Sequence, residues 1–217
     1  MQDLTIEALC AEAKAFSKLE SGRPEPSLYG ITDGKAVGTY LEHKFRAFLA
    51  DRYAFAAGNS ANGIDFPSLG VDMKVTSLRQ PQSSCPFKSA RQKIFGLGYS
   101  LIVFVYSKLD DPQTQTGALS IEHTIYIDKT RTADFQTTRG LRQILENDGN
   151  QDDIAAFLLD RMLPVDEAEA HIIAQEILDG TPVPQGYLTV SNALQWRLQY
   201  RRVIAEAGKI PGIGSIL

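Results

Sequence analysis

Residues 62–77 read NGIDFPSLGVDMKVTS and contain the clearest change of pattern in the chain. Two short runs of strand-forming residues flank the tetrad at 67–70 (PSLG), in which proline and glycine favour a turn. The pattern therefore predicts a β-hairpin whose loop is the tetrad itself. In that register Phe66 pairs with Val71 across the turn.

The predicted hairpin places three charged side chains on one face. Asp65 lies directly opposite Asp72, and Lys74 shares their face because side chains alternate along a strand. Two carboxylates opposed on a sheet repel each other by about 0.2–1 kcal/mol, so a purely structural role does not explain the pair. A divalent cation does explain it, since Mg²⁺ is usually held by one or two carboxylates and takes its other ligands from water and substrate phosphate.

We therefore predict a Mg²⁺ site at Asp65 and Asp72, with Mn²⁺ as a substitute. The metal would polarise a phosphate group and activate a bound water. The ammonium of Lys74 would hold the attacking water and the scissile phosphate, and it would stabilise negative charge in the transition state. The expected reaction is hydrolysis of a phosphodiester bond.

Helical periodicity surrounds the hairpin. After Asp33, apolar residues recur at intervals of three and four and predict an amphipathic helix that ends near Tyr53. A helix capped by Ser83 or Ser84 is expected next, with Pro86 in its first turn and Gly96 and Gly98 at its end. Apolar periodicity predicts five further helices, at about 4–19, 135–146, 151–161, 165–178 and 190–207.

Two segments between these helices have the character of strands. Residues 99–106 (YSLIVFVY) are apolar on both faces, as expected of a central strand covered by helices. Residues 121–128 alternate in polarity and predict a further strand. The combination predicts an α/β fold.

The residues of the hairpin resemble the PD-(D/E)XK nuclease superfamily, which includes most type II restriction endonucleases. The resemblance covers about residues 35–107 and rests on Asp65 followed by Asp72-Met73-Lys74, with an acid-bearing helix before them and a helix and apolar strand after them. By this resemblance Asp65 and Asp72 are the acids of the motif and Lys74 is its lysine. Glu42 is the helical acid that binds the metal directly or through water.

The resemblance also implies a fold and an activity. We expect a restriction-endonuclease-like core, with a mixed β-sheet flanked by helices, in a single nuclease domain over residues 1–217. The core is expected at about 35–130 and a helical C-terminal part at about 131–217. The implied function is Mg²⁺-dependent cleavage of double-stranded DNA at a specific sequence, as in a restriction-modification system. A homodimer is expected, because a two-fold protein matches a palindromic site.

Charge is unevenly distributed along the chain, although the net charge is only −4. Residues 73–109 contain six cations and no acid, whereas residues 146–179 contain ten acids and one cation. This predicts a basic side and an acidic side, with DNA phosphates against the basic one. The residues expected to contact DNA are Thr76, Ser77, Arg79, Lys88, Arg91, Gln92 and Lys93. A stripe of Gln195, Gln199 and Arg202 on the last predicted helix could read bases.

Composition excludes several other classes of protein. The longest apolar run, 99–106, is far shorter than the roughly 20 residues of a membrane span, so we expect a soluble, cytoplasmic protein without a membrane partner. Cys10 and Cys85 are too few and too far apart for a disulfide framework or a zinc site. No Walker or Rossmann fingerprint appears, so no nucleotide cofactor is expected.

Each site residue also has a structural explanation that the sequence leaves open. Asp72 and Lys74 could be an exposed pair on a surface strand. Asp65 could accept backbone amides of the 67–70 loop. Glu42 could pair with Arg46, one helical turn later. The residues assigned to DNA could individually face water.

Two other functions are compatible with the same residues. A repair or recombination nuclease of the same fold would recognise a branch or mismatch rather than a sequence. A non-catalytic DNA-binding module would keep the scaffold but not cut. Digestion of a defined plasmid separates them, because only a restriction enzyme yields discrete fragments.

Overall fold

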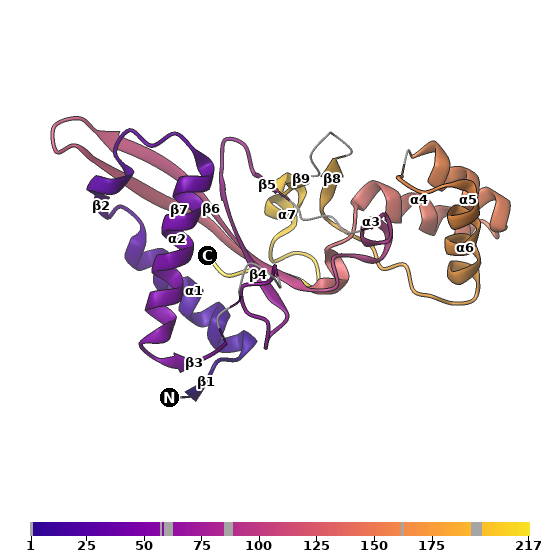
Figure 1. Ribbon diagram of the computed structural model, residues 1–217, viewed down its shortest axis with the longest axis horizontal. Helices are drawn as coiled ribbons and strands as arrows, with labels where there is room; N and C mark the ends of the chain where they lie inside the picture. The colour runs from indigo at the N-terminus through magenta and orange to yellow at the C-terminus, as the bar shows by residue number, and fades with distance from the viewer. Residues whose placement is uncertain (1, 57, 59–62, 85–88, 162, 192–196) are drawn as a thin grey trace. The chain divides into compact units, whose positions relative to one another are not determined.

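The computed structural model describes residues 2–56, 58, 63–84, 89–161, 163–191 and 197–217 (Figure 1). The chain forms two compact units. The first unit comprises residues 1–83, 101–127 and 204–217. The second unit comprises residues 84–100 and 128–203.

The first unit is built on one β-sheet. Its strands lie in the order β10 (Ile213–Ser215), β7 (Thr116–Ile127), β6 (Ser100–Asp111) and β4 (Val71–Ser77), and the short β2 (Pro24–Glu25) also pairs with β7. Strands β6 and β7 form the long antiparallel hairpin in Figure 1. The apolar stretch of β6 is fully buried, as predicted for a central strand.

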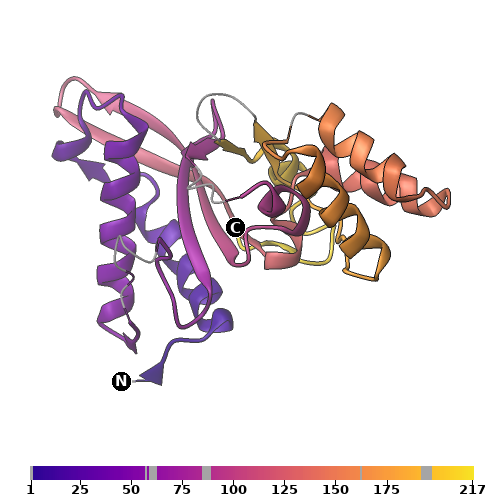
Figure 2. The same cartoon turned by 45° about the vertical axis from the view of Figure 1, so that its right-hand side comes forward.

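Two helices cover this sheet. Helix α1 (Ile6–Glu20) packs against β7, and helix α2 (Gly34–Ala50) packs against β4 (Figure 2). The side chain of Asp33 caps α2 by accepting the backbone N–H groups of Lys35 and Ala36. Both helices were predicted from periodicity, and the α/β architecture with helices flanking a sheet is confirmed.

Aromatic packing holds the helices on the sheet. The ring of Phe45 on α2 lies 5.1 Å from that of Phe16 on α1, 5.2 Å from that of Phe104 on β6 and 6.4 Å from that of Phe66. Each such pair contributes about 0.5–1.5 kcal/mol beyond the burial of its area. Because Phe66 begins the turn before β4, this cluster fixes α2 against the predicted hairpin.

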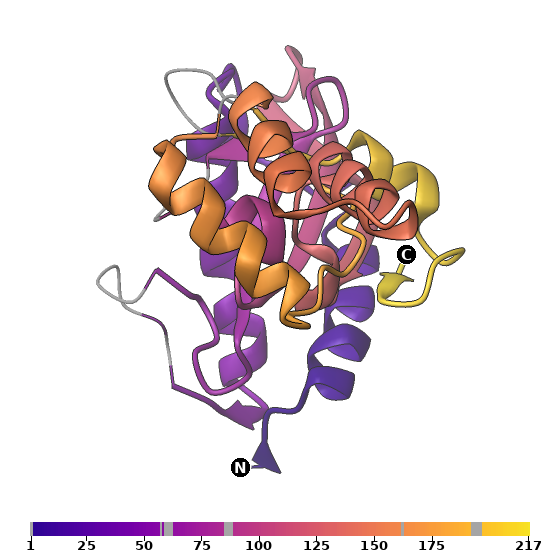
Figure 3. The ribbon, with the colours of Figure 1, turned by 90° about the vertical axis from the view of Figure 1, so that its right-hand side faces the viewer.

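The second unit is mostly helical. Its helices are α3 (Arg91–Phe95), α4 (Phe135–Glu146), α5 (Gln151–Asp160) and α6 (Glu167–Leu178), and α5 lies beside α6 (Figure 3). They bury a second apolar core that includes Ile94, Leu141, Ile154, Leu158 and Ile173. The predictions for 135–146, 151–161 and 165–178 are confirmed to within two residues at either end.

The prediction of a last helix at 190–207 is wrong. The described part of this segment contains strands β8 (Thr189–Ser191) and β9 (Arg197–Gln199), which pair antiparallel, and the short helix α7 (Arg201–Glu206). Val190 pairs with Leu198, and both are buried, so tertiary burial outweighs the local helical pattern. The predicted base-reading stripe therefore does not form on one helix, and Gln195 lies outside the described residues.

The remaining elements are short. They are β1 (Gln2–Asp3), β3 (Tyr53–Ala54), β5 (Gln82–Ser84) and two 3₁₀ turns at Pro26–Leu28 and Lys129–Arg131. Strands β1 and β3 pair in parallel. Across the described part of the chain, no helix is both long and apolar enough to cross a lipid bilayer.

Candidate active site

The turn before β4 has the predicted register. Phe66 N–H donates to the carbonyl of Val71 at 2.9 Å, and Val71 N–H donates back at 3.2 Å. Gly70 has φ of +61°, a conformation that favours glycine, which explains its place at the end of the loop. Pairing is limited to this one bridge, since residues 63–65 form no strand, and Asn62 lies outside the described residues.

Asp65 is held beside β4 by both of its carboxylate oxygens. Oδ2 accepts the backbone N–H of Met73 at 2.8 Å, and Oδ1 forms an ion pair with the guanidinium of Arg46 from α2. The backbone amide that Asp65 accepts therefore comes from β4 and not from the 67–70 loop. This arrangement points the carboxylate at the strand that carries the other two motif residues.

Asp72 and Lys74 lie one pleat apart on β4. Val71 and Met73, which alternate with them, are buried in the apolar core and anchor the strand. Nζ of Lys74 lies 2.7 Å from Oδ2 of Asp72, and the Asp72 side chain is only 3% exposed. The alternative of an exposed surface pair is therefore excluded.

The carboxylate of Asp72 is incompletely satisfied. The Lys74 ammonium is the charged partner of Oδ2 at 2.7 Å, and no further donor among the described residues reaches this buried oxygen. Burial raises the pKa of Asp72 to about 7; Lys74 opposes this rise and Asp65 adds to it. A buried carboxylate in this state is stabilised by any cation that reaches it.

Glu42 lies on α2 within electrostatic reach of the same residues. Burial, followed by the negative charge of Asp65, raises the pKa of Glu42, whereas Lys74 and Arg46 lower it. Arg46, which the sequence alone offered as a partner for Glu42, is paired with Asp65. The role of Glu42 as a metal ligand stays a prediction.

The donor set suits one hard divalent cation held mainly by two carboxylates. No group of three acids, histidines or cysteines with metal-binding geometry occurs among residues 2–217 outside the undescribed gaps. Mg²⁺ needs no such cage, because it commonly keeps several waters and binds one or two carboxylates. The buried Oδ2 of Asp72, which has no donor besides Lys74 among the described residues, and the adjacent carboxylate of Asp65 fit this requirement.

A separate polar cluster fixes α2 on its other side. The hydroxyl of Tyr40 donates to Oε1 of Glu20 at 2.5 Å, and Nζ of Lys44 donates to the same oxygen at 2.9 Å. The Glu20 side chain is 4% exposed, so this carboxylate is buried and paired. The cluster ties α2 to the end of α1 and helps to hold Glu42 and Arg46 in place.

The residues expected to contact DNA occupy different surroundings. Thr76 is buried, and its hydroxyl accepts the N–H of Gln82 at 2.8 Å within the loop that follows β4. Ser77 accepts the N–H of Gln80 in that loop, and Arg79 is exposed there. Lys88 lies outside the described residues.

Three further candidates for DNA contact lie in the second unit. Arg91 forms ion pairs with Glu169 at 2.9 Å and Glu176 at 2.5 Å on α6. Lys93 is buried, and the amide of Gln92 donates to the carbonyl of Leu97 at 3.4 Å. The separation of basic and acidic segments expected from the sequence is therefore not maintained at Arg91, which joins the two.

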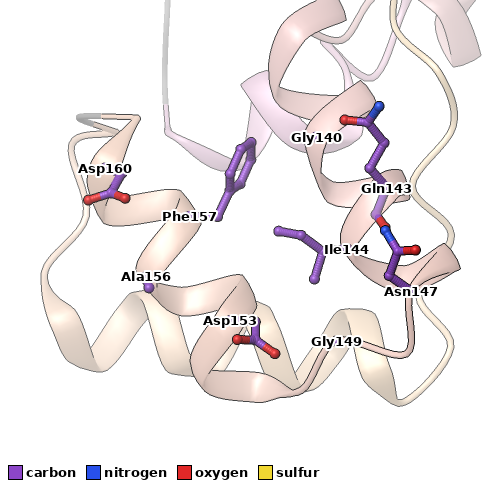
Figure 4. A pocket seen from close by; sticks show the side chains of 9 residues that line it. All are labelled: Gly140, Gln143, Ile144, Asn147, Gly149, Asp153, Ala156, Phe157 and Asp160. Carbon is purple, nitrogen blue, oxygen red and sulfur yellow. The ribbon is translucent and has the colours of Figure 1, made fainter.

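A hollow of about 540 Å³ lies between α4 and α5 in the second unit (Figure 4). Phe157 and Ile144 form its apolar part, and its charged lining residues are Asp153 and Asp160. Because carboxylates repel phosphate, this hollow is a poor site for nucleic acid. The residues to which the sequence assigned catalysis lie in the first unit, not at this hollow.

Sequence reasoning missed Arg46 as a residue of the site. The ion pair with Asp65 joins positions that are far apart in the sequence, and only the packing of α2 on β4 brings them together. The available signal was the spacing of Arg46 one helical turn after Glu42, on the side that faces the hairpin.

Comparisons with known proteins identify the family of the chain. The family described as type II restriction enzyme NspV matches residues 3–215. Type II restriction enzyme NspV of Nostoc sp. (strain ATCC 29411 / PCC 7524) is 66% identical to this chain over 216 residues, which span 100% of this chain and 98% of that protein. No solved structure gives a significant match.

Proposed function

We propose, because the chain belongs to the NspV family of type II restriction enzymes, that its DNA-cutting site is the cluster of Asp65, Asp72, Lys74 and Glu42. Membership of this family makes the chain a sequence-specific endodeoxyribonuclease that acts on double-stranded DNA. It also favours this activity over the repair nuclease and the non-catalytic module that the sequence left open.

One observation carries the assignment of the site. Asp72 is a buried carboxylate that lies next to the carboxylate of Asp65, and the only donor that reaches its Oδ2 among the described residues is the ammonium of Lys74. Such an arrangement is costly unless a cation completes it. A strand that only maintained the fold would gain stability by placing an apolar residue at this position.

Type II restriction enzymes generally use Mg²⁺, and Asp65 and Asp72 are the residues that would hold it here. When bound, Mg²⁺ supplies Lewis acidity and lowers the pKa of a water molecule. Lys74 positions the attacking water and neutralises charge that develops on the phosphate. Glu42 adds negative charge on the helical side of the site, where it binds the metal directly or through water.

The DNA duplex is proposed to run past the loop that follows β4. Arg79 is exposed on this loop, and Ser77 shapes it by accepting the N–H of Gln80. An exposed guanidinium close in sequence to the proposed site is suited to a phosphate contact. A homodimer, with one such site for each strand of a palindrome, completes the proposal.

The direct test compares wild type with Asp72→Ala on mixed plasmid DNA in Mg²⁺, followed by sequencing of the ends. We expect discrete fragments with one shared sequence at the ends for wild type and none for the variant. Asp110→Ala is the matched control, because Asp110 also pairs with a lysine two residues away on a strand, here Lys108 on β6. Equal cutting by Asp72→Ala and wild type would reject the site.

A further inference from the structure

Arg46 occupies the carboxylate that the proposed metal needs. It lies on α2, and its Nη2 forms an ion pair with Oδ1 of Asp65. The other oxygen of Asp65 already accepts the N–H of Met73 at 2.8 Å. Both oxygens of Asp65 therefore have partners in this structure.

The guanidinium of Arg46 is not fully used by this pair. Its Nε is buried and has no acceptor among the residues that the structure describes. The Arg46 side chain as a whole is 30% exposed, so its guanidinium can change position without disturbing the apolar core. An arginine fork carries five N–H donors in a fixed plane, and a buried donor without an acceptor is costly.

Metal and guanidinium compete for the same charge. A dication on Asp65 repels the guanidinium at Oδ1, so the ion pair with Arg46 is weakened as the metal binds. A guanidinium released from Asp65 would then be free to bind a phosphate of the DNA. Planar, bidentate recognition of phosphate is what arginine does better than lysine.

We infer that Arg46 couples metal binding to DNA binding: it neutralises Asp65 in the metal-free enzyme and transfers to the substrate phosphate when the metal occupies Asp65. This inference rests on the proposed function. It assigns a role in binding substrate to a residue outside the nuclease motif. The same coupling makes metal binding weaker in the free enzyme than in the complex with DNA.

The test measures metal and DNA binding separately, using Arg46→Met. Calorimetric titration of the DNA-free protein with Mn²⁺ is expected to show about tenfold tighter binding in the variant, because a competing unit charge is gone. Affinity for a duplex carrying the mapped cut site, measured in Ca²⁺, is expected to fall about tenfold, because a charge-assisted contact to phosphate is lost. Unchanged or weaker Mn²⁺ binding would overturn the inference.

Two further variants keep the result interpretable. Arg46→Lys retains the charge but not the planar guanidinium. This variant is expected to bind Mn²⁺ as wild type does and to bind the duplex less tightly. Wild-type affinity for the duplex would count against the role of Arg46, even if Arg46→Met fails to fold. Arg52→Met removes the ion pair of Arg52 with Glu12, 2.6 Å long, at the end of α2 and is expected to change neither affinity.

Failure of the proposed function is distinguishable from failure of this inference. If Asp72→Ala cuts DNA as wild type does, the proposed site is wrong. If Asp72→Ala is inactive and Arg46→Met binds Mn²⁺ no more tightly than wild type, the site stands and only the coupling role of Arg46 is rejected.

Discussion

The ammonium of Lys74 and the carboxylate of Asp72 lie 2.7 Å apart, with the Asp72 side chain almost fully buried. Among the described residues, no donor other than Lys74 reaches the buried Oδ2 of Asp72. A contact of this kind is a poor source of stability, because the cost of burying two charges offsets most of their attraction. In the proposed site, a bound cation and a phosphate would supply the charge and the ligands that this pair lacks.

Asp72→Asn is expected to reduce the cleavage rate by at least about 100-fold and to stabilise the metal-free protein at pH 8. Because burial raises the pKa of Asp72 to about 7 from 3.8, the folded state binds this proton more tightly than the unfolded state. Wild-type stability in EDTA should therefore fall as pH rises through the window between these values. Asparagine cannot ionise, so the stability of the Asp72→Asn variant should not fall with pH in this window.

Urea denaturation in EDTA at pH 5 and pH 8 measures this difference. At pH 8 the variant should be more stable than wild type by on the order of 2 kcal/mol. Asp110→Asn, at a partly exposed strand position, is the control and should not alter the pH profile. A wild-type protein equally stable at both values would contradict the prediction.

Lys74→Gln is expected to reduce the single-turnover cleavage rate by about 10²–10³-fold, which is the usual effect of removing one donor that stabilises transition-state charge. Mn²⁺ binding should be at least as tight as in wild type, because the cation beside Asp72 is gone. Quenched-flow cleavage and calorimetry measure the two effects. Lys108→Gln, which breaks the comparable pair with Asp110 on β6, should cut normally; a parallel loss of metal affinity in Lys74→Gln would argue against this role.

Arg79→Gln is expected to weaken DNA binding about equally for specific and non-specific duplexes. A phosphate contact contributes affinity without reading sequence, so the slope of log affinity against log salt should decrease in magnitude by about one. Fluorescence anisotropy of labelled duplexes at several salt concentrations measures this slope. Lys14→Gln, on the exposed side of α1, is the control, and a loss confined to the specific duplex would contradict a phosphate contact.

Lys93→Met is expected to stabilise the protein at neutral pH. Burial lowers the pKa of Lys93, with Asp134 opposing the shift and Arg161 adding to it. The unfolded state therefore binds this proton more tightly, and wild-type stability should rise with pH as it approaches the ordinary lysine value of 10.5. Urea denaturation at pH 7 and pH 9.5 should show this rise in wild type and a smaller one in the variant; equal rises would contradict the prediction.

Arg91→Gln tests whether this arginine maintains the fold or contacts DNA. Its ion pairs with Glu169 and Glu176 are partly exposed, so their loss should lower the melting temperature by no more than about 4 °C. DNA affinity at equal salt should be unchanged if those pairs are kept in the complex. A drop in affinity together with an unchanged melting temperature would instead support the phosphate contact expected from the sequence.

Local patterns were sufficient for much of the fold. The proline and glycine of the tetrad at 67–70 set the pairing of Phe66 with Val71, and apolar periodicity located α2 and α4. The prediction of a helix at 190–207 failed because long-range pairing overrides the local pattern. There, pairing between β8 and β9 and the burial of Leu198 outweigh helix propensity.

The sequence alone predicted that Asp65, Asp72 and Lys74 lie together, because alternation along one strand and the span of one turn are short-range geometry. Only the tertiary structure placed Arg46 on Asp65, buried Asp72 beside Lys74 and engaged Arg91 with α6. These contacts depend on how helices pack on a sheet and on one another. No rule of spacing within the chain contains that information, because burial and long-range pairing are properties of the assembled core.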